Sequence, residues 1–153
     1  MEAPSTSQGY SLRPANAADA RTIRQIISLV HINPTGLSWK RFILAVDLHG
    51  SIIGCGQLKP HGDGSLELAS IAVLPEWRGK GVARSIIEYL LELHPDRLYL
   101  TCRAELGPMY EKFGFQVVNP AEMPPYFKRV SGLVNLFPRL GRQPDHLLVM
   151  VRN

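Results

Sequence analysis

Three strand-like segments in the middle of the chain, residues 41–47, 51–59 and 66–74, constrain the fold more than any other feature of the sequence. Each is rich in apolar residues, and only short turns that contain glycine, at residues 49–50 and 61–65, separate them. Turns this short join neighbouring antiparallel strands, because a parallel connection needs a crossover of about a dozen residues or more. The sequence therefore predicts an antiparallel meander.

Segments with helical spacing lie on both sides of this meander. Asn16 can cap a helix in which apolar residues recur at i, i+3, i+4 and i+7 from Ile23. Residues 81–93 carry a second such stripe, which His94 and Pro95 end. Further strands are predicted at residues 10–14, 98–102, 115–118 and 146–152, and a short helix at 107–113. This order predicts an α+β fold with a central mixed, mostly antiparallel sheet flanked by α-helices.

The composition fits one water-soluble globular domain. The 153 residues are 45% hydrophobic and 20% charged, which excludes disordered and fibrous classes. We expect a flexible tail over residues 1–9 and one domain over residues 10–153. No run approaches the roughly 18 apolar residues of a membrane helix, and the first residues lack the features of an export signal. We therefore expect a cytoplasmic protein.

The cysteines and histidines show no pattern of a metal site. Cys55 and Cys102 lie in apolar runs, where a buried free thiol is usual, and they are too few for a disulfide framework. The five histidines have neither a second histidine nor a cysteine at metal-ligand spacing, so no metal is predicted. Cys102 lacks a triad-like neighbour, and we expect it to pack in the core.

The net charge of +4 raises the question of nucleic-acid binding. The 17 basic residues are scattered, however, and 13 acidic residues are interleaved with them, so no basic stripe is visible. A mildly basic surface and a small polyanionic ligand, such as a nucleotide or a coenzyme, are both compatible with this pattern.

The segment between the last strand of the meander and the second helix has the features of an anion site. Arg78, Gly79, Lys80 and Gly81 come directly before the helix. Unpaired amides at a helix start point outward, and glycines allow a phosphate to approach them. A plain glycine turn is the alternative. The spacing matches neither the P-loop nor the dinucleotide fingerprint, so both nucleotide-binding motifs are excluded.

Arg78-x-x-Gly81-x-Ala83, placed after an apolar strand, looks like the [RQ]-x-x-G-x-[GA] acetyl-coenzyme A signature of the GNAT N-acetyltransferase superfamily. The start at Tyr10-Ser11-Leu12-Arg13-Pro14-Ala15, with Asp19, resembles the first strand and helix start of that family. Residues 109–115, MYEKFGF, resemble its late Y-E-K-x-G-F element. The resemblance spans roughly residues 10–118 and implies a single GNAT-like domain that uses acetyl-CoA as co-substrate.

The resemblance also implies roles for individual residues. Backbone groups of one strand would pair with the pantetheine arm, loop amides would hold the pyrophosphate, and Arg78 would brace the loop or the phosphates. These coenzyme-binding positions are Ile71, Ala72, Val73, Arg78, Gly79, Lys80, Gly81, Val82 and Ala83. Tyr110 corresponds to the tyrosine that commonly protonates the leaving thiolate. Arg103 and Leu106 stand where many relatives carry Asn and Ala, which leaves the coenzyme contacts of that helix open.

The implied reaction is direct attack of a primary amine on the thioester in a ternary complex. An ammonium group cannot attack, so the site needs a proton acceptor. We expect Glu67 in this role, because strand alternation places it beside Ala69 and Ile71 between two buried faces, where a carboxylate is costly. Some family members carry a glutamate base at this place, whereas a solvent-exposed Glu at the strand end is the alternative.

The acceptor is open among an amino acid, a polyamine, an aminoglycoside and a protein amine. A non-catalytic acetyl-CoA sensor, which would need neither Glu67 nor Tyr110, is the alternative function. Trp39 is expected either in the acceptor pocket or on the surface. Residues 119–145 are predicted to form a long loop. Two uses fit it: a cover over an acidic acceptor, through its cations Lys128, Arg129 and Arg139, or a homodimer contact.

Overall fold

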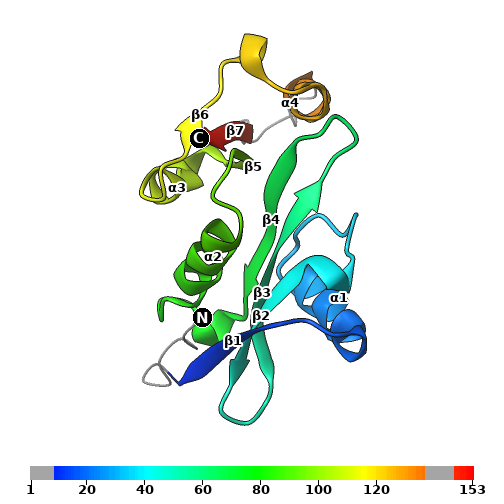
Figure 1. Cartoon of the computed structure of the whole chain (residues 1–153), viewed down its shortest axis with the longest axis vertical. Helices are drawn as coiled ribbons and strands as arrows, with labels where there is room; N and C mark the ends of the chain where they lie inside the picture. The colour runs from blue at the N-terminus through cyan, green and yellow to red at the C-terminus, as the bar shows by residue number, and fades with distance from the viewer. Residues whose placement is uncertain (1–8, 137–146) are drawn as a thin grey trace, which may run out of the picture. The chain divides into compact units, whose positions relative to one another are not determined.

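The structure, a computed structural model, describes residues 9–136 and 147–153, and side chains for residues 9–132 and 147–153 (Figure 1). The tail predicted over residues 1–9 lies outside this part of the chain except for Gly9, as does Arg139. The strands are β1 Tyr10–Pro14, β2 Phe42–Asp47, β3 Ile52–Pro60, β4 Leu66–Val73, β5 Leu98–Arg103, β6 Gln116–Val117 and β7 Leu147–Arg152. The α-helices are α1 Ala20–Leu29, α2 Val82–Leu93, α3 Gly107–Glu111 and α4 Pro125–Leu136.

Hydrogen bonding orders the described strands β1-β2-β3-β4-β5-β7-β6. The β1–β2, β2–β3, β5–β7 and β6–β7 pairs are antiparallel, and β4 meets β5 in parallel where Glu67 pairs with Tyr99. The predicted α+β fold with a mixed, mostly antiparallel sheet is confirmed. Among the described residues, no helix has the length and apolar character needed to cross a membrane.

The chain divides into two compact units, which we describe separately. The first contains Met1–Lys59 and Leu68–Pro95, and the second contains Pro60–Glu67 and Asp96–Asn153. The tip of the β3–β4 hairpin therefore belongs to the second unit. The single domain expected over residues 10–153 stays a prediction.

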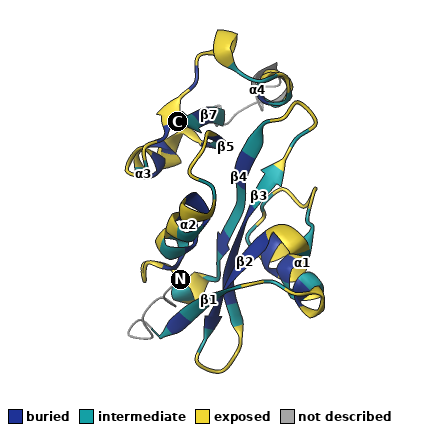
Figure 2. Cartoon of the chain, in the orientation of Figure 1, coloured by how far each residue is buried: buried dark blue, intermediate teal, exposed yellow. Residues whose placement is uncertain are grey.

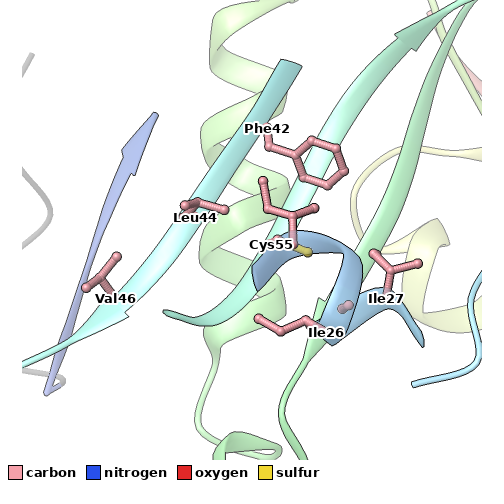
Figure 3. Packing of buried hydrophobic residues seen from close by; sticks show 8 residues of the cluster. Ile26, Ile27, Phe42, Leu44, Val46 and Cys55 are labelled. Carbon is pink, nitrogen blue, oxygen red and sulfur yellow. The ribbon is translucent and has the colours of Figure 1, made fainter. Parts of the chain in front are cut away.

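In the first unit, α1 packs on one face of the strands. Asn16 and Asp19 form a capping box at the start of a 3₁₀ turn, Ala17–Asp19, that leads directly into α1. The buried side chains of α1 meet those of β2, β3 and β4 in a cluster that we call the α1 core (Figure 3). Its members are Ile23, Ile26, Ile27, Phe42, Leu44, Val46, Cys55 and Ala72. This core contains no ionisable group except the thiol of Cys55, whose pKa burial raises to about 12.

The opposite face of β3 carries α2. Residues on a strand alternate between faces, so Gly54 and Gly56 point away from the α1 core. A Cβ added to Gly56 would lie 2.6 Å from Ile71 Cδ1 and 2.7 Å from Ile86 Cγ2, which shows how closely α2 approaches the sheet. The inner face of α2 is buried and its outer face exposed (Figure 2). The glycine therefore fixes the distance of α2 from the strands.

The second unit has a smaller core, which we call the aromatic cluster. It consists of Tyr99, Val118, Phe127 and Val149, with Met123, Tyr126 and Val151 packed against it. Phe127 lies on α4, and its ring stacks on that of Tyr99 with centroids 5.2 Å apart. Strands β5 and β7 supply Tyr99, Val149 and Val151.

One local prediction is wrong, and one residue of β4 departs from the geometry of a regular strand. The loop predicted over residues 119–145 contains helix α4, which starts at Pro125, since proline suits the first turn of a helix. Along β4, Glu67 and Leu68 are both buried, as expected for a strand with two buried faces, and Ser70 departs from extended geometry with a φ of 59°. A residue in the left-handed region shifts the faces on which the following residues lie.

Candidate active site

The loop before α2 is open on its outer side. Gly79 and Gly81 have φ values of 75° and 80°, and no atom of the described residues lies within 4 Å of a Cβ added to either. Gly81 is the N-cap of α2 and supplies no capping side chain, and Arg78 and Lys80 are exposed. The first amides of the twelve-residue helix are thus accessible beside two cations. This donor set fits the pyrophosphate of a coenzyme.

Side chains from β1 and the preceding turn hold this loop. Tyr10 donates from its hydroxyl to the carbonyl of Gly81 at 3.2 Å and shares a 2.6 Å hydrogen bond with Ser85 Oγ. Trp77 packs edge-on against Tyr10, with ring centroids 6.3 Å apart. The Nζ of Lys80 lies over the Trp77 ring, 4.8 Å from its centroid. Sequence reasoning missed these supports, because more than seventy residues separate Tyr10 from its partners and no local pattern links them.

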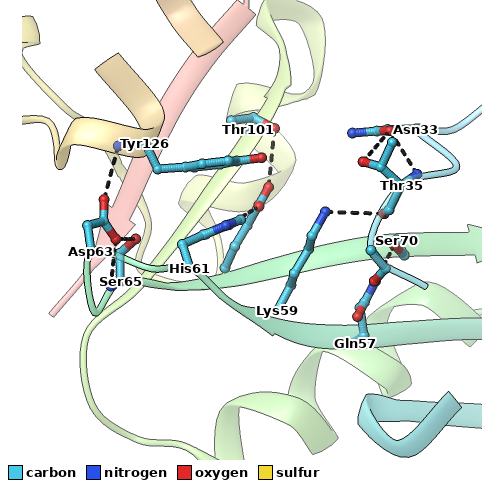
Figure 4. A network of polar contacts seen from close by, with 12 residues as sticks. Asn33, Thr35, Gln57, Lys59, His61, Asp63, Ser65, Ser70, Thr101 and Tyr126 are labelled. Atoms are coloured by element: carbon cyan, nitrogen blue, oxygen red, sulfur yellow. Dashed lines mark hydrogen bonds and ion pairs between the residues drawn. The ribbon is translucent and has the colours of Figure 1, made fainter. Parts of the chain in front are cut away.

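A small hydrogen-bond network lies at Ser70, before the end of β4. Gln57 donates from Nε2 to Ser70 Oγ at 2.8 Å and to the carbonyl of Gly36 at 3.3 Å (Figure 4). Its Oε1 is buried and has no hydrogen-bond partner among the described residues. Ser70 directly precedes the three positions proposed for the pantetheine arm, of which Ala72 is buried and Ile71 and Val73 are partly exposed.

Glu67 is buried in the second unit, with 7% of its surface exposed. Its Oε1 lies 2.7 Å from His61 Nε2, and its Oε2 lies 3.5 Å from Thr101 Oγ1 (Figure 4). The exposed-glutamate alternative is therefore wrong. Sequence reasoning missed His61, although it stands six residues before Glu67 across a tight hairpin, which is the signal that links them.

Tyr110 is also buried in the second unit, with its ring edge-on to Phe115 at 6.2 Å between centroids. Burial, and then the nearby Cys102, raise its pKa to about 12. The phenol therefore stays protonated at neutral pH, as a proton donor must. Burial also raises the pKa of Cys102, which keeps that thiol uncharged and fits a core role.

The remaining predicted residues lie at the surface or in the packing. Arg103 is exposed, with its Nε 3.3 Å from Glu105 Oε1, and Leu106 is exposed as well. Trp39 packs against the α1 core beside Leu37. Both cysteines are free and buried, as predicted. In the part of the chain that the structure describes, no group of three or more potential ligands could hold a metal ion.

The family model and the solved structures that match this chain point to the same family. The sequence profile of the acetyltransferase (GNAT) domain matches residues 38–117. A search of curated proteins finds no match.

Solved structures match most of the chain at low identity. N-acetylglutamate synthase from Neisseria gonorrhoeae, complexed with coenzyme A and N-acetyl-glutamate, matches with a TM-score of 0.71 and 20% identity, over 94% of this chain and 34% of that one. Rv2747 from Mycobacterium tuberculosis, in complex with CoA and NLQ, matches with a TM-score of 0.68 and 21% identity, over 92% of this chain and 97% of that one. A GNAT-family acetyltransferase from Staphylococcus aureus Mu50 matches with a TM-score of 0.67 and 16% identity, over 94% of this chain and 98% of that one. The chain thus spans about a third of the Neisseria synthase but nearly all of the other two.

Proposed function

Because the chain belongs to the GNAT acetyltransferase domain family, we propose that it transfers the acetyl group of acetyl-CoA to a primary amine. The observation that carries this proposal is the open glycine loop before α2, which lies inside the segment matched by the family. An enzyme of this kind must hold a coenzyme that bears several phosphates, and the loop presents backbone donors and cations to such a group.

In this proposal, the first unit holds the coenzyme. The amides from Gly79 to Ala83 bind the pyrophosphate, and Arg78 and Lys80 add positive charge. The backbone of Ile71, Ala72 and Val73 pairs with the pantetheine arm. When bound, acetyl-CoA supplies the activated acyl group, and orientation of the two reactants contributes a large part of the rate.

The proton transfers fall to two buried residues of the second unit. Glu67 takes a proton from the acceptor ammonium, directly or through a water, so that the neutral amine attacks the thioester carbonyl. The C–N bond forms and the C–S bond breaks. Tyr110 protonates the departing thiolate and regains a proton from the nitrogen, so that one proton is released for each acetyl group transferred.

An acidic amino acid is the acceptor we propose to test first. The Neisseria synthase was solved with N-acetyl-glutamate, and Lys128 and Arg129 are exposed on α4. A polyamine, an aminoglycoside and a protein amine are the other classes. We also propose a homodimer that forms through α4. A cytoplasmic location is proposed as well, because it suits two free buried thiols.

Binding and turnover of acetyl-CoA test this proposal together. The midpoint of thermal unfolding should rise by several degrees with acetyl-CoA or CoA near 100 times their dissociation constants, but not with ATP or duplex DNA. CoA release should follow when glutamate or another accepted amine is added. Binding without release across the whole amine panel would favour the sensor function, and no binding would overturn the proposal.

Two matched glycine variants locate the binding site. Gly81→Ala and Gly50→Ala both place a Cβ at a φ near 80°, so both should lose a similar stability of about 1 kcal/mol. Only Gly81→Ala stands in the proposed pyrophosphate cradle, and we expect it alone to weaken acetyl-CoA binding. Equal affinities in the two variants would contradict the assignment of the loop.

A further inference from the structure

A buried histidine–glutamate pair lies at the tip of the β3–β4 hairpin. The Nε2 of His61 is 2.7 Å from Oε1 of Glu67, and the side chains are 6% and 9% exposed. Two acceptors cannot approach this closely without a proton between them, so one hydrogen bond joins the imidazole to the carboxyl group. The proposed chemistry uses Glu67 but leaves His61 unexplained.

Aromatic rings fix the plane of the His61 imidazole. Tyr126 stacks on it with ring centroids 3.5 Å apart and an interplanar angle of 15°. Phe127 meets the same ring edge-on, with centroids 5.6 Å apart at 86°. Both rings belong to α4, and Phe127 is fully buried in the aromatic cluster. The imidazole therefore has little freedom to turn its Nε2 away from Glu67.

The turn that carries His61 is tied to the start of α4. The amide of His61 donates to the carbonyl of Ser65 at 2.9 Å, and Asp63 Oδ2 accepts from the amide of Tyr126 at 3.0 Å. Asp63 Oδ1 accepts from the amide of Ser65 at 2.9 Å. Together these bonds hold the backbone of the turn and the stacking tyrosine in one arrangement.

The two oxygens of Glu67 have different surroundings. Oε1 faces His61 at 2.7 Å, whereas Thr101 Oγ1 is 3.5 Å from Oε2, at the limit of a hydrogen bond. A short bond to one oxygen leaves the other as the better site for an incoming proton. The charge of Glu67 also acts on Tyr126, whose pKa is raised by burial and then by this carboxylate.

We infer that His61 is a positioning residue for the proposed acetyl transfer: its Nε2–H holds Oε1 of Glu67 and directs Oε2 to the proton of the acceptor amine. This inference rests on the proposed function, since it assigns the support of the proposed proton acceptor. The proton passes from the acceptor nitrogen to Oε2, and His61 keeps its own proton throughout. Misplacement of a reacting group by about 1 Å can cost on the order of 100-fold in rate, so such support is worth measuring.

Two substitutions separate positioning from packing. His61→Phe keeps an aromatic ring for Tyr126 to stack on but removes the donor to Glu67. His61→Gln removes the ring but places an N–H donor at a similar reach. Positioning predicts that kcat falls about 10- to 100-fold in His61→Phe and stays within about threefold in His61→Gln. Packing alone predicts the reverse order.

The comparison needs three controls. The KM for acetyl-CoA should change little in both variants, because His61 does not belong to the proposed coenzyme site. His49→Phe, at an exposed histidine in the preceding hairpin turn, should leave kcat unchanged. In a Glu67→Gln background, His61→Phe should cause no further loss, because a positioning residue acts only through the group that it holds.

The unaltered chain separates the two possible failures. If it transfers no acetyl group to any amine of the panel, the proposed function fails and this inference fails with it. If it is active and His61→Phe retains full kcat while folding normally, only the inference is overturned. A loss in His61→Phe that His61→Gln restores is the expected result.

Discussion

The α1 core and the aromatic cluster differ in what they enclose. The α1 core joins α1 to three strands through aliphatic side chains, one phenylalanine and one uncharged thiol. The aromatic cluster instead contains Phe127, whose ring meets the imidazole of the buried His61–Glu67 pair edge-on. Packed apolar side chains stabilise a fold, whereas a buried ionisable pair rarely adds net stability. In the proposed function, the first region therefore serves stability and the second serves chemistry.

A large-to-small substitution in each region tests this difference between the two regions most strongly. Phe42 and Phe127 are both about 1% exposed or less, and replacement of either by alanine should lower the free energy of unfolding by about 3–5 kcal/mol. Well below the unfolding midpoint, only Phe127→Ala should also lower kcat, because its ring packs on His61. Urea unfolding and CoA release measure the two effects.

A milder variant keeps that test informative if Phe127→Ala does not fold. Phe127→Leu should retain most of the stability while it alters the contact with the imidazole. Equal kcat values in folded Phe42 and Phe127 variants would contradict the division into a stabilising and a reactive region.

Removal of the Tyr110 hydroxyl should give the next largest effect. We expect Tyr110→Phe to lower kcat by about 10- to 100-fold without a comparable change in the KM for acetyl-CoA. Because burial raises the pKa of Tyr110 to about 12, the unaltered enzyme should show no loss of rate from this group up to about pH 10. A pH–rate series on both proteins measures this. Full activity in the variant would exclude Tyr110 as the proton donor.

The helix cap in the first unit should affect stability alone. Asn16 accepts from the amide of Ala18 and completes a capping box with Asp19. Asn16→Ala should cost about 1 kcal/mol of unfolding free energy, whereas Asn16→Gly should cost only a few tenths. Thermal unfolding gives the difference, and kcat at 25 °C should not change in either variant. A lower kcat would contradict a role for this cap in stability alone.

The smallest effect is expected from Asp63, and it depends on pH. Hydrogen bonds from Ser65 and from the Tyr126 amide lower its pKa from 3.8 to about 2. A carboxylate with a lowered folded-state pKa stabilises the fold above its unfolded-state pKa, and this contribution is lost as the pH falls towards 2. Asp63→Asn should therefore reduce stability slightly at pH 7, and the difference should vanish near pH 2. A difference that is constant with pH would contradict this origin.

Local signals in the sequence predict most of the fold. The hairpin turns, the Asn16 cap and the apolar stripe of α2 each depend on residues close together in the chain, and the structure bears them out. The sequence does not predict helix α4, because Pro125 and Gly132 have low helix propensity. In the structure, the tertiary packing of Phe127 outweighs this low propensity. The hydrogen bonds from Gln57 to Ser70 and to Gly36 join segments that no local pattern connects.

The candidate site was predictable only where one motif carries it. The loop from Arg78 to Ala83 is a contiguous pattern, and its role in coenzyme binding stays a prediction. His61 is linked to Glu67 by a six-residue spacing across the hairpin turn, but the ring that stacks on it, Tyr126, lies on α4, far along the chain. Contacts that join distant segments are formed by the fold and are visible only there.

The most direct test compares stability and rate in one variant, Glu67→Gln. This change removes the carboxylate and keeps the volume, so that the free energy of unfolding should change by no more than about 1 kcal/mol. The rate of acetyl transfer to the best acceptor of the amine panel should fall by about 100-fold or more at unchanged acetyl-CoA affinity. That result would place Glu67 in the reaction. An unchanged rate, with or without a loss of stability, would show that the buried carboxylate serves the fold and that the proton acceptor lies elsewhere.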